Sequence, residues 1–277
     1  MVKTLNELLK KRGLPQKVNL LAFITISSQP MAKYAHDLVM PNVASNESKK
    51  NQVAEMFDNI AHRYDFLNRF MSAGIDIGWR KKAIKEISSV RPKVILDVAT
   101  GTADVALLTN KMLQPNKIIG IDISEGMLNL GREKIAKLHL QRIIDLQLGD
   151  SEAIAFEDNY FDAVTVAFGV RNFENLEKGL KEILRVLKPR GKFVVLECSR
   201  PTKKGFKGFY HFYMNKIMPR FGSIFSGNKE AYLYLNNSVQ AFPEGQQFLN
   251  IMNEAGFTQT YLKTLSLGVC TIYCGSK

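Results

Sequence analysis

Short apolar runs and helix-like stretches alternate along the chain from Lys93 onward. The helix-like stretches carry apolar residues three and four positions apart, whereas the apolar runs are short, as in strands buried on both faces of a sheet. Strands are predicted at 93–99, 117–123, 142–149, 161–169 and 192–199. Helices follow the first, second and fourth strands, at 105–113, 125–138 and 174–188, and LKPRGK, 187–192, predicts a helix stop and turn. The alternation predicts an α/β fold, a parallel sheet with helices on both faces.

The two ends of this region have other patterns. Between 46 and 90, apolar residues recur at helical spacing, beginning with Val53, Met56, Phe57 and Ile60. Near the carboxyl end the pattern predicts a helix at 244–256, followed by strands at 258–264 and 269–275 that are antiparallel about Gly268. Residues 200–242 are predicted to be irregular.

The segment VILDVATGTAD, residues 94–104, is the most informative of the chain. A predicted strand leads here into a turn of small residues around Gly101, and small side chains let a ligand approach the main chain. The next strand ends in Asp122, about 20 residues after Gly101. An acid at that position can accept hydrogen bonds from both hydroxyls of a ribose. The sequence therefore predicts a cofactor that contains a nucleoside.

The charges around the turn indicate which cofactor this is. A dinucleotide site has G-x-G-x-x-G here, with room for a pyrophosphate on the helix N-terminus. This chain has only Gly101, and Asp104 at the helix start would repel a phosphate. Asp97 adds a second acid, and an acid-lined turn suits S-adenosylmethionine, whose ammonium and sulfonium groups are positive. Stabilisation by the helix dipole is the alternative for Asp104 and does not account for Asp97.

The third predicted strand ends in LQLGDSEAIAF. Asp150 there can accept a hydrogen bond from the adenine amino group, and Ser151 can offer a backbone N–H to the ring. Gly-Asp-Ser alone is an ordinary turn, and its significance comes from its place at a strand end beside Asp122, where such sheets bind ligands. Ile123 and Met127 either pack on the adenine faces or belong to the core.

Four segments together resemble one family. They are VILDVATGTAD, GIDISEGMLNLGREK, GDSEAIAFEDNYFDAVTVAFGVRN and LKEILRVLKPRGKFVVLECSRP, and they are similar to the C-methyltransferases of quinone biosynthesis, the UbiE/MenG family. The resemblance covers 47–277. It implies a class I Rossmann-like S-adenosylmethionine-dependent methyltransferase with a C-terminal antiparallel strand pair. It further implies an N-terminal helical lid at 46–90 and a methyltransferase domain at 91–277 with an insertion at 200–242.

The resemblance also implies an activity, the methylation of demethylmenaquinol to menaquinol. The alternative is the ubiquinone branch, which methylates a 2-polyprenyl-6-methoxy-1,4-benzoquinol. Thr-Ala-Asp in the first turn favours menaquinone. The family's cofactor contacts correspond to Thr102, Asp122, Asp150 and Ser151, to which the turn itself adds Asp97 and Gly101. Two positions depart from the family: many members have Gly in place of Ala103, and some use serine for the cofactor in place of Ala167.

Ring methylation needs a group that takes the phenolic proton or stabilises a phenolate. FGVRN follows the fourth strand, so Arg171 and Asn172 are the catalytic candidates: the guanidinium stabilises oxyanion character and the amide orients the hydroxyl. The alternative is that Arg171 pairs with Glu174 or another acid. By resemblance, Tyr64 belongs to a segment that folds over the site. The insertion offers Tyr210, Tyr213, Tyr232 and Tyr234 as candidates to line a quinone pocket.

Composition bears on the partners of this protein. The 277 residues carry a formal net charge of +12, which favours an anionic membrane surface, nucleic acid or an acidic ligand. Residues 198–229 contain no acid and mix Lys and Arg with aromatic residues, so the hypothesis is peripheral docking on the inner face of the cytoplasmic membrane, where a polyprenyl quinol resides. A solvated basic loop is the alternative. The four scattered histidines indicate no metal site.

The three cysteines form no CxxC, which fits a reducing cytoplasm. Cys198 superficially resembles the nucleophile of RNA cytosine methyltransferases, but FGVRN stands where those enzymes have Pro-Cys, and no nucleic acid partner is expected. A non-catalytic cofactor-binding subunit is a further alternative. Residues 1–45 are expected to be an extension, either not native or disordered. Its apolar run at 20–26 is too short to span a bilayer and imitates a secretory signal.

Overall fold

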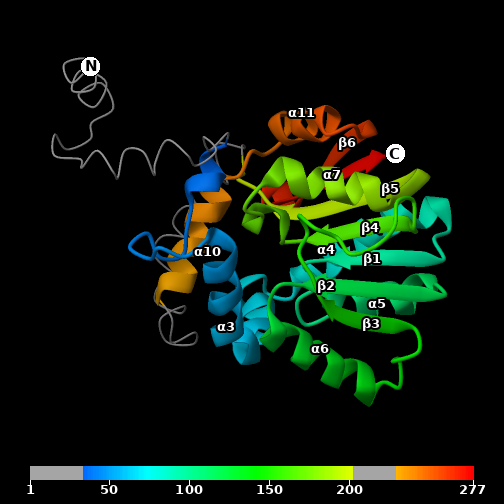
Figure 1. Ribbon diagram of the computed structural model, residues 1–277, viewed down its shortest axis with the longest axis horizontal. Helices are drawn as coiled ribbons and strands as arrows, with labels where there is room; N and C mark the ends of the chain where they lie inside the picture. The colour runs from blue at the N-terminus through cyan, green and yellow to red at the C-terminus, as the bar shows by residue number, and fades with distance from the viewer. Residues whose placement is uncertain (1–33, 202–228) are drawn as a thin grey trace. The chain divides into compact units, whose positions relative to one another are not determined.

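One mixed β-sheet runs through the part of the chain that the structure, a computed structural model, describes: residues 34–201 and 229–277 (Figure 1). The strand order is β3-β2-β1-β4-β5-β7-β6. The first five strands pair in parallel, and β7 is antiparallel to both β5 and β6. The bounds are β1 Val94–Val98, β2 Lys117–Asp122, β3 Ile144–Leu148, β4 Phe161–Ala167, β5 Leu187–Cys198, β6 Thr258–Leu265 and β7 Cys270–Ser276. The predicted parallel sheet and C-terminal antiparallel pair are confirmed.

Helices cover both faces of this sheet. α4, α5 and α6 pack on one face in a single apolar cluster, and α7 and α11 pack on the other face in a second cluster. Helices α3 and α10 lie at the end of the sheet beyond the strands (Figure 1). The bounds are α3 Lys49–Met71, α4 Ile75–Ile87, α5 Asp104–Leu113, α6 Glu125–Lys137, α7 Leu176–Val186, α10 Lys229–Ala241 and α11 Gln246–Glu254. Short 3-10 turns lie at η1 Ala35–Leu38, η2 Ser88–Val90, η3 Val170–Asn172 and η5 Ser266–Gly268.

Three helices near the strand ends begin at a polar side chain that caps them. Ser48 precedes α3, Ser124 precedes α6 and Asn175 precedes α7, and each side-chain oxygen accepts a hydrogen bond from the backbone N–H three residues further on. Such caps satisfy donors that the first helical turn leaves unpaired. They fix where each helix starts and hence how the preceding loop leaves its strand.

Strand β5 begins five residues earlier than predicted, so the turn predicted at 187–192 is wrong. Phe161 pairs with Leu187, and the register shifts before Ala163 pairs with Lys192. Arg190 has a φ of 66°, in the left-handed region. A strand that contains such an irregularity carries residues typical of turns, and Pro-Arg-Gly therefore marks a distortion within the strand.

The prediction that 200–242 is irregular is also wrong in part, because α10 occupies its last third. Ala231, Tyr234 and Ser238 are buried at helical spacing. Ala231 and Tyr234 pack with Val53 and Met56 of α3 in a small separate cluster. The buried face of α10 is narrow and partly polar, so the sequence carries only a weak helical pattern there. Residues 202–228, with Tyr210 and Tyr213, lie outside the described residues.

The start of the chain, residues 1–33, also lies outside the described residues. The remainder of the expected extension contains η1, which packs on the fold. His36 is fully buried there, its ring stacked on Tyr34 and edge-on to Phe242. Among the helices of 34–201 and 229–277, none has the length and apolar character to cross a membrane.

Candidate active site

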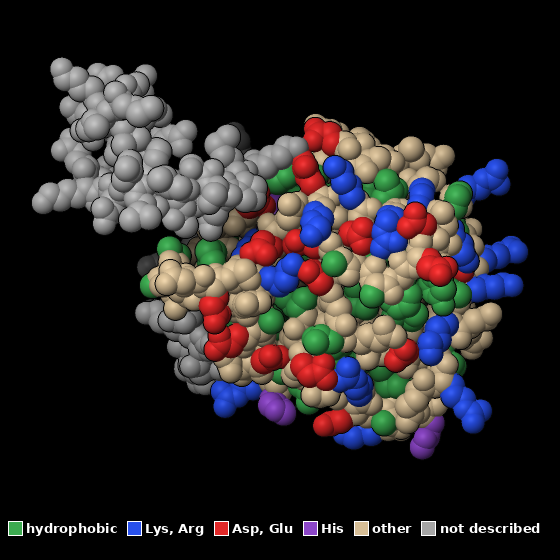
Figure 2. All heavy atoms as spheres, viewed as in Figure 1, with side chains coloured by type: hydrophobic (Ala, Val, Ile, Leu, Met, Phe, Trp, Pro, Cys, Tyr) green, Lys and Arg blue, Asp and Glu red, His purple; other side chains and the backbone are tan. Residues whose placement is uncertain are grey.

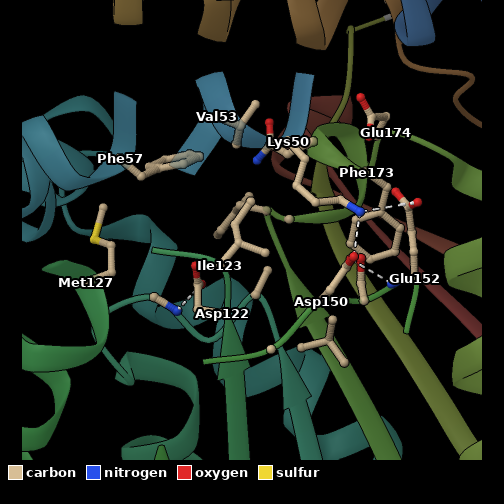
Figure 3. Close-up of a pocket in the computed structure, with 18 of the residues that line it drawn as sticks. Lys50, Val53, Phe57, Asp122, Ile123, Met127, Asp150, Glu152, Phe173 and Glu174 are labelled. Atoms are coloured by element: carbon tan, nitrogen blue, oxygen red, sulfur yellow. Dashed lines mark hydrogen bonds and ion pairs between the residues drawn. The ribbon is translucent and has the colours of Figure 1, made fainter. Parts of the chain in front are cut away.

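A cavity of about 70 Å³ lies where the parallel strands end. The loops after β1, β2, β3 and β4 form one side, and α3 forms the other (Figure 3). Its volume is far below the roughly 300–1,000 Å³ of pockets that hold drug-sized ligands, so side chains of α3 have to move for a ligand of nucleoside size. The lining includes Lys50, Val53, Phe57, Tyr64, Gly101, Asp122, Ile123, Met127, Asp150, Ser151, Glu152, Ala167, Phe168, Asn172 and Glu174.

Asp97 stabilises the turn after β1 through hydrogen bonds of its carboxylate. Its carboxylate accepts hydrogen bonds from the hydroxyls of Thr100 and Thr165, both at 2.7 Å. Asp97 is buried, and this burial raises the pKa of its carboxyl to about 6. Asp97 does not line the cavity. Its oxygens hold the turn in shape, although the sequence predicted a contact with the cofactor.

Gly101 and Asp122 connect this turn to the end of β2. The N–H of Gly101 donates to Asp122 Oδ2 at 2.8 Å, and the N–H of Ser124 donates to Oδ1 at 2.9 Å. Burial raises the pKa of Asp122, although these hydrogen bonds act in the opposite direction. Gly101 has a φ of 55°, which favours glycine. Because a carboxylate has about four acceptor sites, Asp122 can still accept hydrogen bonds from a ribose in the cavity.

Thr102, a predicted cofactor contact, does not line the cavity. Its hydroxyl donates to Asp65 Oδ1 at 2.6 Å, and Lys134 Nζ lies 3.0 Å from the same hydroxyl. Lys134 Nζ also pairs with Asp65 Oδ2 at 2.5 Å. The next residue, Ala103, is fully buried with a φ of 65°, a backbone conformation in which the glycine of other family members would be less strained.

Asp150 and Ser151 line the cavity after β3, as predicted for the adenine end. Asp150 Oδ1 accepts a hydrogen bond from the N–H of Glu152 at 2.9 Å. Asp150 Oδ2 lies 2.5 Å from Nζ of Lys50, which reaches down from α3 (Figure 3). Glu152 Oε2 is 3.5 Å from the same ammonium. Ile123 and Met127 line the cavity too, so both are in reach of a ring bound there.

Helix α3 is tied to three of the strand ends by polar side chains of one face. Lys50, Asp58 and Asp65 are about two helical turns apart. Lys50 contacts the loop after β3, and Asp65 contacts the turn after β1. Between them, Asp58 accepts hydrogen bonds from the Ser124 hydroxyl at 2.6 Å and the Gly126 N–H at 2.8 Å, after β2. The order along α3 follows the order β3-β2-β1 in the sheet.

Arg171 is buried in an ion pair with an acid, as the alternative interpretation of the sequence held, and the acid is Glu197 in place of Glu174. Arg171 Nη1 lies 2.5 Å from Oε1 of Glu197, which is completely buried on β5, and also donates to the Phe168 carbonyl at 2.6 Å. Glu174 instead accepts a hydrogen bond from the N–H of Lys49. Burial opposes the charge of Arg171, but Glu197 and, to a lesser extent, the neighbouring Cys198, Tyr64 and Tyr234 together raise the pKa of the guanidinium. Arg171 therefore stays charged and cannot serve as a base.

Asn172 and Tyr64 line the cavity beside Arg171. The Tyr234 hydroxyl, from α10, donates to Asn172 Oδ1 at 3.1 Å. Burial raises the pKa of Tyr64, and the charge of Arg171 acts on that phenol in the opposite direction. The buried Nε of Arg171 has no hydrogen-bond partner among the described residues. Tyr64, Asn172 and Arg171 thus place a phenol, an amide and a fixed positive charge next to one another.

The structure brings most of the predicted site residues together. Those that line the cavity are Tyr64, Gly101, Asp122, Asp150, Ser151 and Asn172. Asp97 and Thr102 lie outside the lining, next in sequence to Val98 and Gly101, which belong to it, and Arg171 donates to the carbonyl of Phe168, another lining residue. The sequence did not indicate Lys50, Glu152 or Glu197, whereas Tyr234 was among the tyrosines expected near a quinone pocket. Glu152, two residues after Asp150, is the one among the first three that the strand-end pattern could have indicated.

Cys198 lacks the environment of a nucleophile. Burial raises the pKa of its thiol to about 11, whereas reactive cysteines have lowered pKa values. Within the described residues, no three His, Cys, Asp or Glu side chains gather as they would around a metal ion.

The sheet order, the glycine turn and the acid at the end of β2 define a class I S-adenosylmethionine-dependent methyltransferase. A methyltransferase of this kind from Thermotoga maritima is 18% identical, with a TM-score of 0.56 over 81% of this chain and 99% of its own. Phosphoethanolamine N-methyltransferase 2 from Haemonchus contortus is 15% identical, with a TM-score of 0.57 over 81% of this chain and 59% of its own. At these identities the likeness concerns the fold.

Within that class, residues 45–277 match the ubiE/COQ5 methyltransferase family, and the chain belongs to this family. The demethylmenaquinone methyltransferase of Bacteroides fragilis is 47% identical over 84% of this chain and 96% of its own length. The ubiquinone/menaquinone biosynthesis C-methyltransferase UbiE of Geobacter sulfurreducens is 44% identical over 83% of this chain and 90% of its own length.

Proposed function

We propose that the chain transfers a methyl group from S-adenosylmethionine to a ring carbon of demethylmenaquinol, which yields menaquinol. The observation that carries this proposal is one cavity lined by two chemically distinct sets of residues. Asp122 and Asp150 are carboxylates after β2 and β3, and Tyr64 and Asn172 are a phenol and an amide beside Arg171. Relatives named demethylmenaquinone methyltransferase, from Bacteroides fragilis and Desulfitobacterium hafniense, are 47% and 40% identical and support the choice of substrate.

The chemistry of the cavity fits this cofactor. Asp122, Asp150, Glu152 and Glu174 line it with carboxylates, which suit a cationic ligand and would repel a phosphate. The left-handed turn at Gly101 leaves room at the main chain, because a Cβ there would meet nothing within 4 Å. S-adenosylmethionine, when bound, supplies an electrophilic methyl carbon. Asp122 would hold the ribose, and Asp150 with Ser151 would hold the adenine.

Asn172 and the neighbouring Arg171 would activate the quinol. A ring carbon becomes nucleophilic when the phenolic proton leaves or is largely shared. Arg171 lies just behind the cavity wall, and its fixed charge would stabilise the negative charge that develops on the phenolic oxygen. Asn172, held by Tyr234, would orient the hydroxyl. A water molecule is the proposed proton carrier, since the guanidinium stays protonated.

Helices α3 and α4 are proposed to act as a lid, with residues 91–277 as the methyltransferase domain. The contacts of α3 with three strand ends support this role. The small volume of the cavity supports it too, because a nucleoside and a quinol could enter only after side chains of α3, or the helix beyond its anchored first turn, move.

Peripheral docking on the cytoplasmic side of the membrane is proposed as well, because a polyprenyl quinol resides in the bilayer. The support comes from sequence: 198–229 is free of acids and mixes cationic with aromatic residues. Of these cations, Arg200 is described and pairs with Glu244 at 2.9 Å. Lys203, Lys204, Lys207, Lys216, Arg220 and Lys229 belong to the stretch whose side chains are not described.

A comparison of two substrates tests the proposed function. Purified protein would receive S-adenosylmethionine and either demethylmenaquinol or a 2-polyprenyl-6-methoxy-1,4-benzoquinol with the same prenyl chain. We expect methylation of demethylmenaquinol with the higher kcat/KM. The reverse preference would assign the chain to ubiquinone synthesis, the alternative that relatives such as the one from Geobacter sulfurreducens leave open. No methylation of either substrate would contradict the proposal.

A further inference from the structure

Lys50 lies in the proposed adenine subsite, where its ammonium group occupies the main hydrogen-bond acceptor, Asp150. Its Nζ is 2.5 Å from Asp150 Oδ2 and 3.5 Å from Glu152 Oε2, and Figure 3 shows the side chain reaching from α3 to both. The other oxygen of Asp150 already accepts the Glu152 N–H. Partial burial opposes the charge of Lys50, but the hydrogen bond to Asp150 and the nearby Glu152 together raise its pKa. The ammonium is therefore charged at neutral pH.

The helix turn that carries Lys50 is fixed in place. The backbone N–H of the preceding residue, Lys49, donates to Glu174 Oε1 at 2.9 Å. The buried ammonium of Lys49 donates to the carbonyls of His36 at 2.8 Å and Phe173 at 3.1 Å. Because the backbone is anchored there, Lys50 can leave Asp150 only by turning its own side chain. Glu152 is the nearest carboxylate that can then receive the ammonium.

We propose that Lys50 is an internal competitor for Asp150 that the adenine amino group has to displace. This inference rests on the proposed function, because it assumes that the cavity binds an adenine nucleoside. Adenine donates one hydrogen bond to Asp150 as the ammonium shifts toward Glu152. No covalent bond changes and no proton is transferred. Part of the binding free energy of the cofactor is thus spent on breaking an ion pair, and Lys50 sets the affinity of the adenine subsite.

Removal of the competitor tests this directly. Calorimetry would measure the affinity of S-adenosylhomocysteine for the wild-type chain and for Lys50→Met, which keeps an unbranched side chain without the charge. Both side chains of this ion pair are 28% exposed, and a partly solvated pair contributes little, so we expect Lys50→Met to bind about two- to fivefold more tightly. Lys81→Met is the matched control, since Lys81 is exposed on α4 outside the cavity. It should bind like the wild-type chain.

Two uncharged nucleosides separate this competition from a change in the electric field. Adenosine and purine riboside, which lacks the amino group, would compete against S-adenosylhomocysteine. Lys50→Met should improve adenosine binding by the same two- to fivefold and leave purine riboside unchanged. An equal gain for both nucleosides, or an unchanged or weaker affinity for S-adenosylhomocysteine in Lys50→Met, would overturn the role of Lys50 alone. A wild-type chain that binds no S-adenosylhomocysteine would overturn the proposed function together with it.

Discussion

At the scale of single residues, buried charge concentrates around the proposed chemistry. Arg171 and Glu197 are 5% and 0% exposed and form an ion pair. Glu197 also accepts a hydrogen bond from the N–H of Cys198, so the pair is fixed by the backbone of β5. Taking either charge away leaves the other buried without a partner, which costs stability as well as chemistry. Stability and turnover therefore have to be measured separately at this pair.

The residue pair leads to the first prediction. Arg171→Ala should lower kcat about 100-fold or more and keep the Kd for S-adenosylhomocysteine within about twofold, since Arg171 does not line the cavity. It should also lose about 3–5 kcal/mol of unfolding free energy. The control is Arg171→Met with Glu197→Gln, which removes both charges and should recover most of that stability. If this double variant also recovers turnover, Arg171 acts through stability and has no part in catalysis.

A second prediction concerns His36. Burial lowers the pKa of this imidazole to about 4. In the unfolded chain the imidazole takes up a proton below pH 6.5, so acidification from pH 6.5 toward 4 favours unfolding. Between pH 7.5 and 5.0 His36 should account for a loss of about 2 kcal/mol. His36→Phe should lack this part of the pH dependence.

Urea unfolding at about pH 7.5 and pH 5.0 would measure the contribution of His36 to the free energy of unfolding. The raised pKa of Asp97 has the opposite sign, since its protonated form is favoured in the folded state and stability falls as pH rises from 4 to about 6. That contribution is present in both proteins and cancels in the comparison. The same pH dependence in His36→Phe and in the wild-type chain would show that the imidazole is not buried uncharged.

At the scale of elements, α3 matters most, because it faces the ends of β1, β2 and β3 through Asp65, Asp58 and Lys50. Each contact joins a helix side chain to a loop that holds part of the proposed cofactor site. We expect a ligand that enters the cavity to loosen some of these contacts and the proposed lid to close again over what is bound. These hydrogen bonds would then couple the proposed lid to the cofactor site.

Hydrogen exchange tests that coupling. In Asp58→Ala with Asp65→Ala, peptides of 49–71 should exchange about tenfold faster, because hydrogen bonds to two charged side chains are lost. Peptides of β1, which lies inside the sheet, should be unaffected. Glu55→Ala is the control, an exposed acid on the same helix. Equal exchange of 49–71 in the double variant and in this control would mean that the two aspartates do not hold the lid.

The elements that the sequence predicted have a local signature, and those it missed do not. β1, β2 and β4 are mainly apolar and β3 alternates apolar with polar residues, and Gly101, Asp122 and Asp150 lie at or just after the ends of β1, β2 and β3. Lys50 and Asp150 are 100 residues apart, and Arg171 and Glu197 are 26 apart. Nothing in a short window of sequence indicates such pairs, because the topology of the sheet creates them. The same holds for α10, whose buried face is defined by α3.

At the scale of the whole molecule, the net charge of +12 is not a property of the described surface alone. On the face that Figure 2 shows, acidic side chains lie among the basic ones. The acid-free segment 198–229 is the sequence feature that concentrates positive charge. An anionic membrane would therefore be met chiefly by that segment.

Liposome flotation tests this assignment. The protein should float with vesicles rich in phosphatidylglycerol at low salt, and this binding should fall sharply near 0.5 M salt, where charges are screened within about 4–5 Å. Flotation with these vesicles should weaken in the triple variant Lys203→Gln with Lys204→Gln and Lys207→Gln. It should not weaken when three lysines of α4, Lys81, Lys82 and Lys85, are changed to Gln instead. Equal loss in both triple variants, or equal flotation with neutral vesicles, would remove the segment from membrane contact.

The central claim, that this cavity methylates a quinol on carbon, has one most direct test. The wild-type protein would be incubated with demethylmenaquinol and S-adenosylmethionine labelled with ¹³C in the methyl group, and the product examined by mass spectrometry and NMR. The account predicts menaquinol with the label on a ring carbon, and S-adenosylhomocysteine in equal amount. A labelled methyl group on oxygen, or an unlabelled quinol in the presence of bound cofactor, would contradict it.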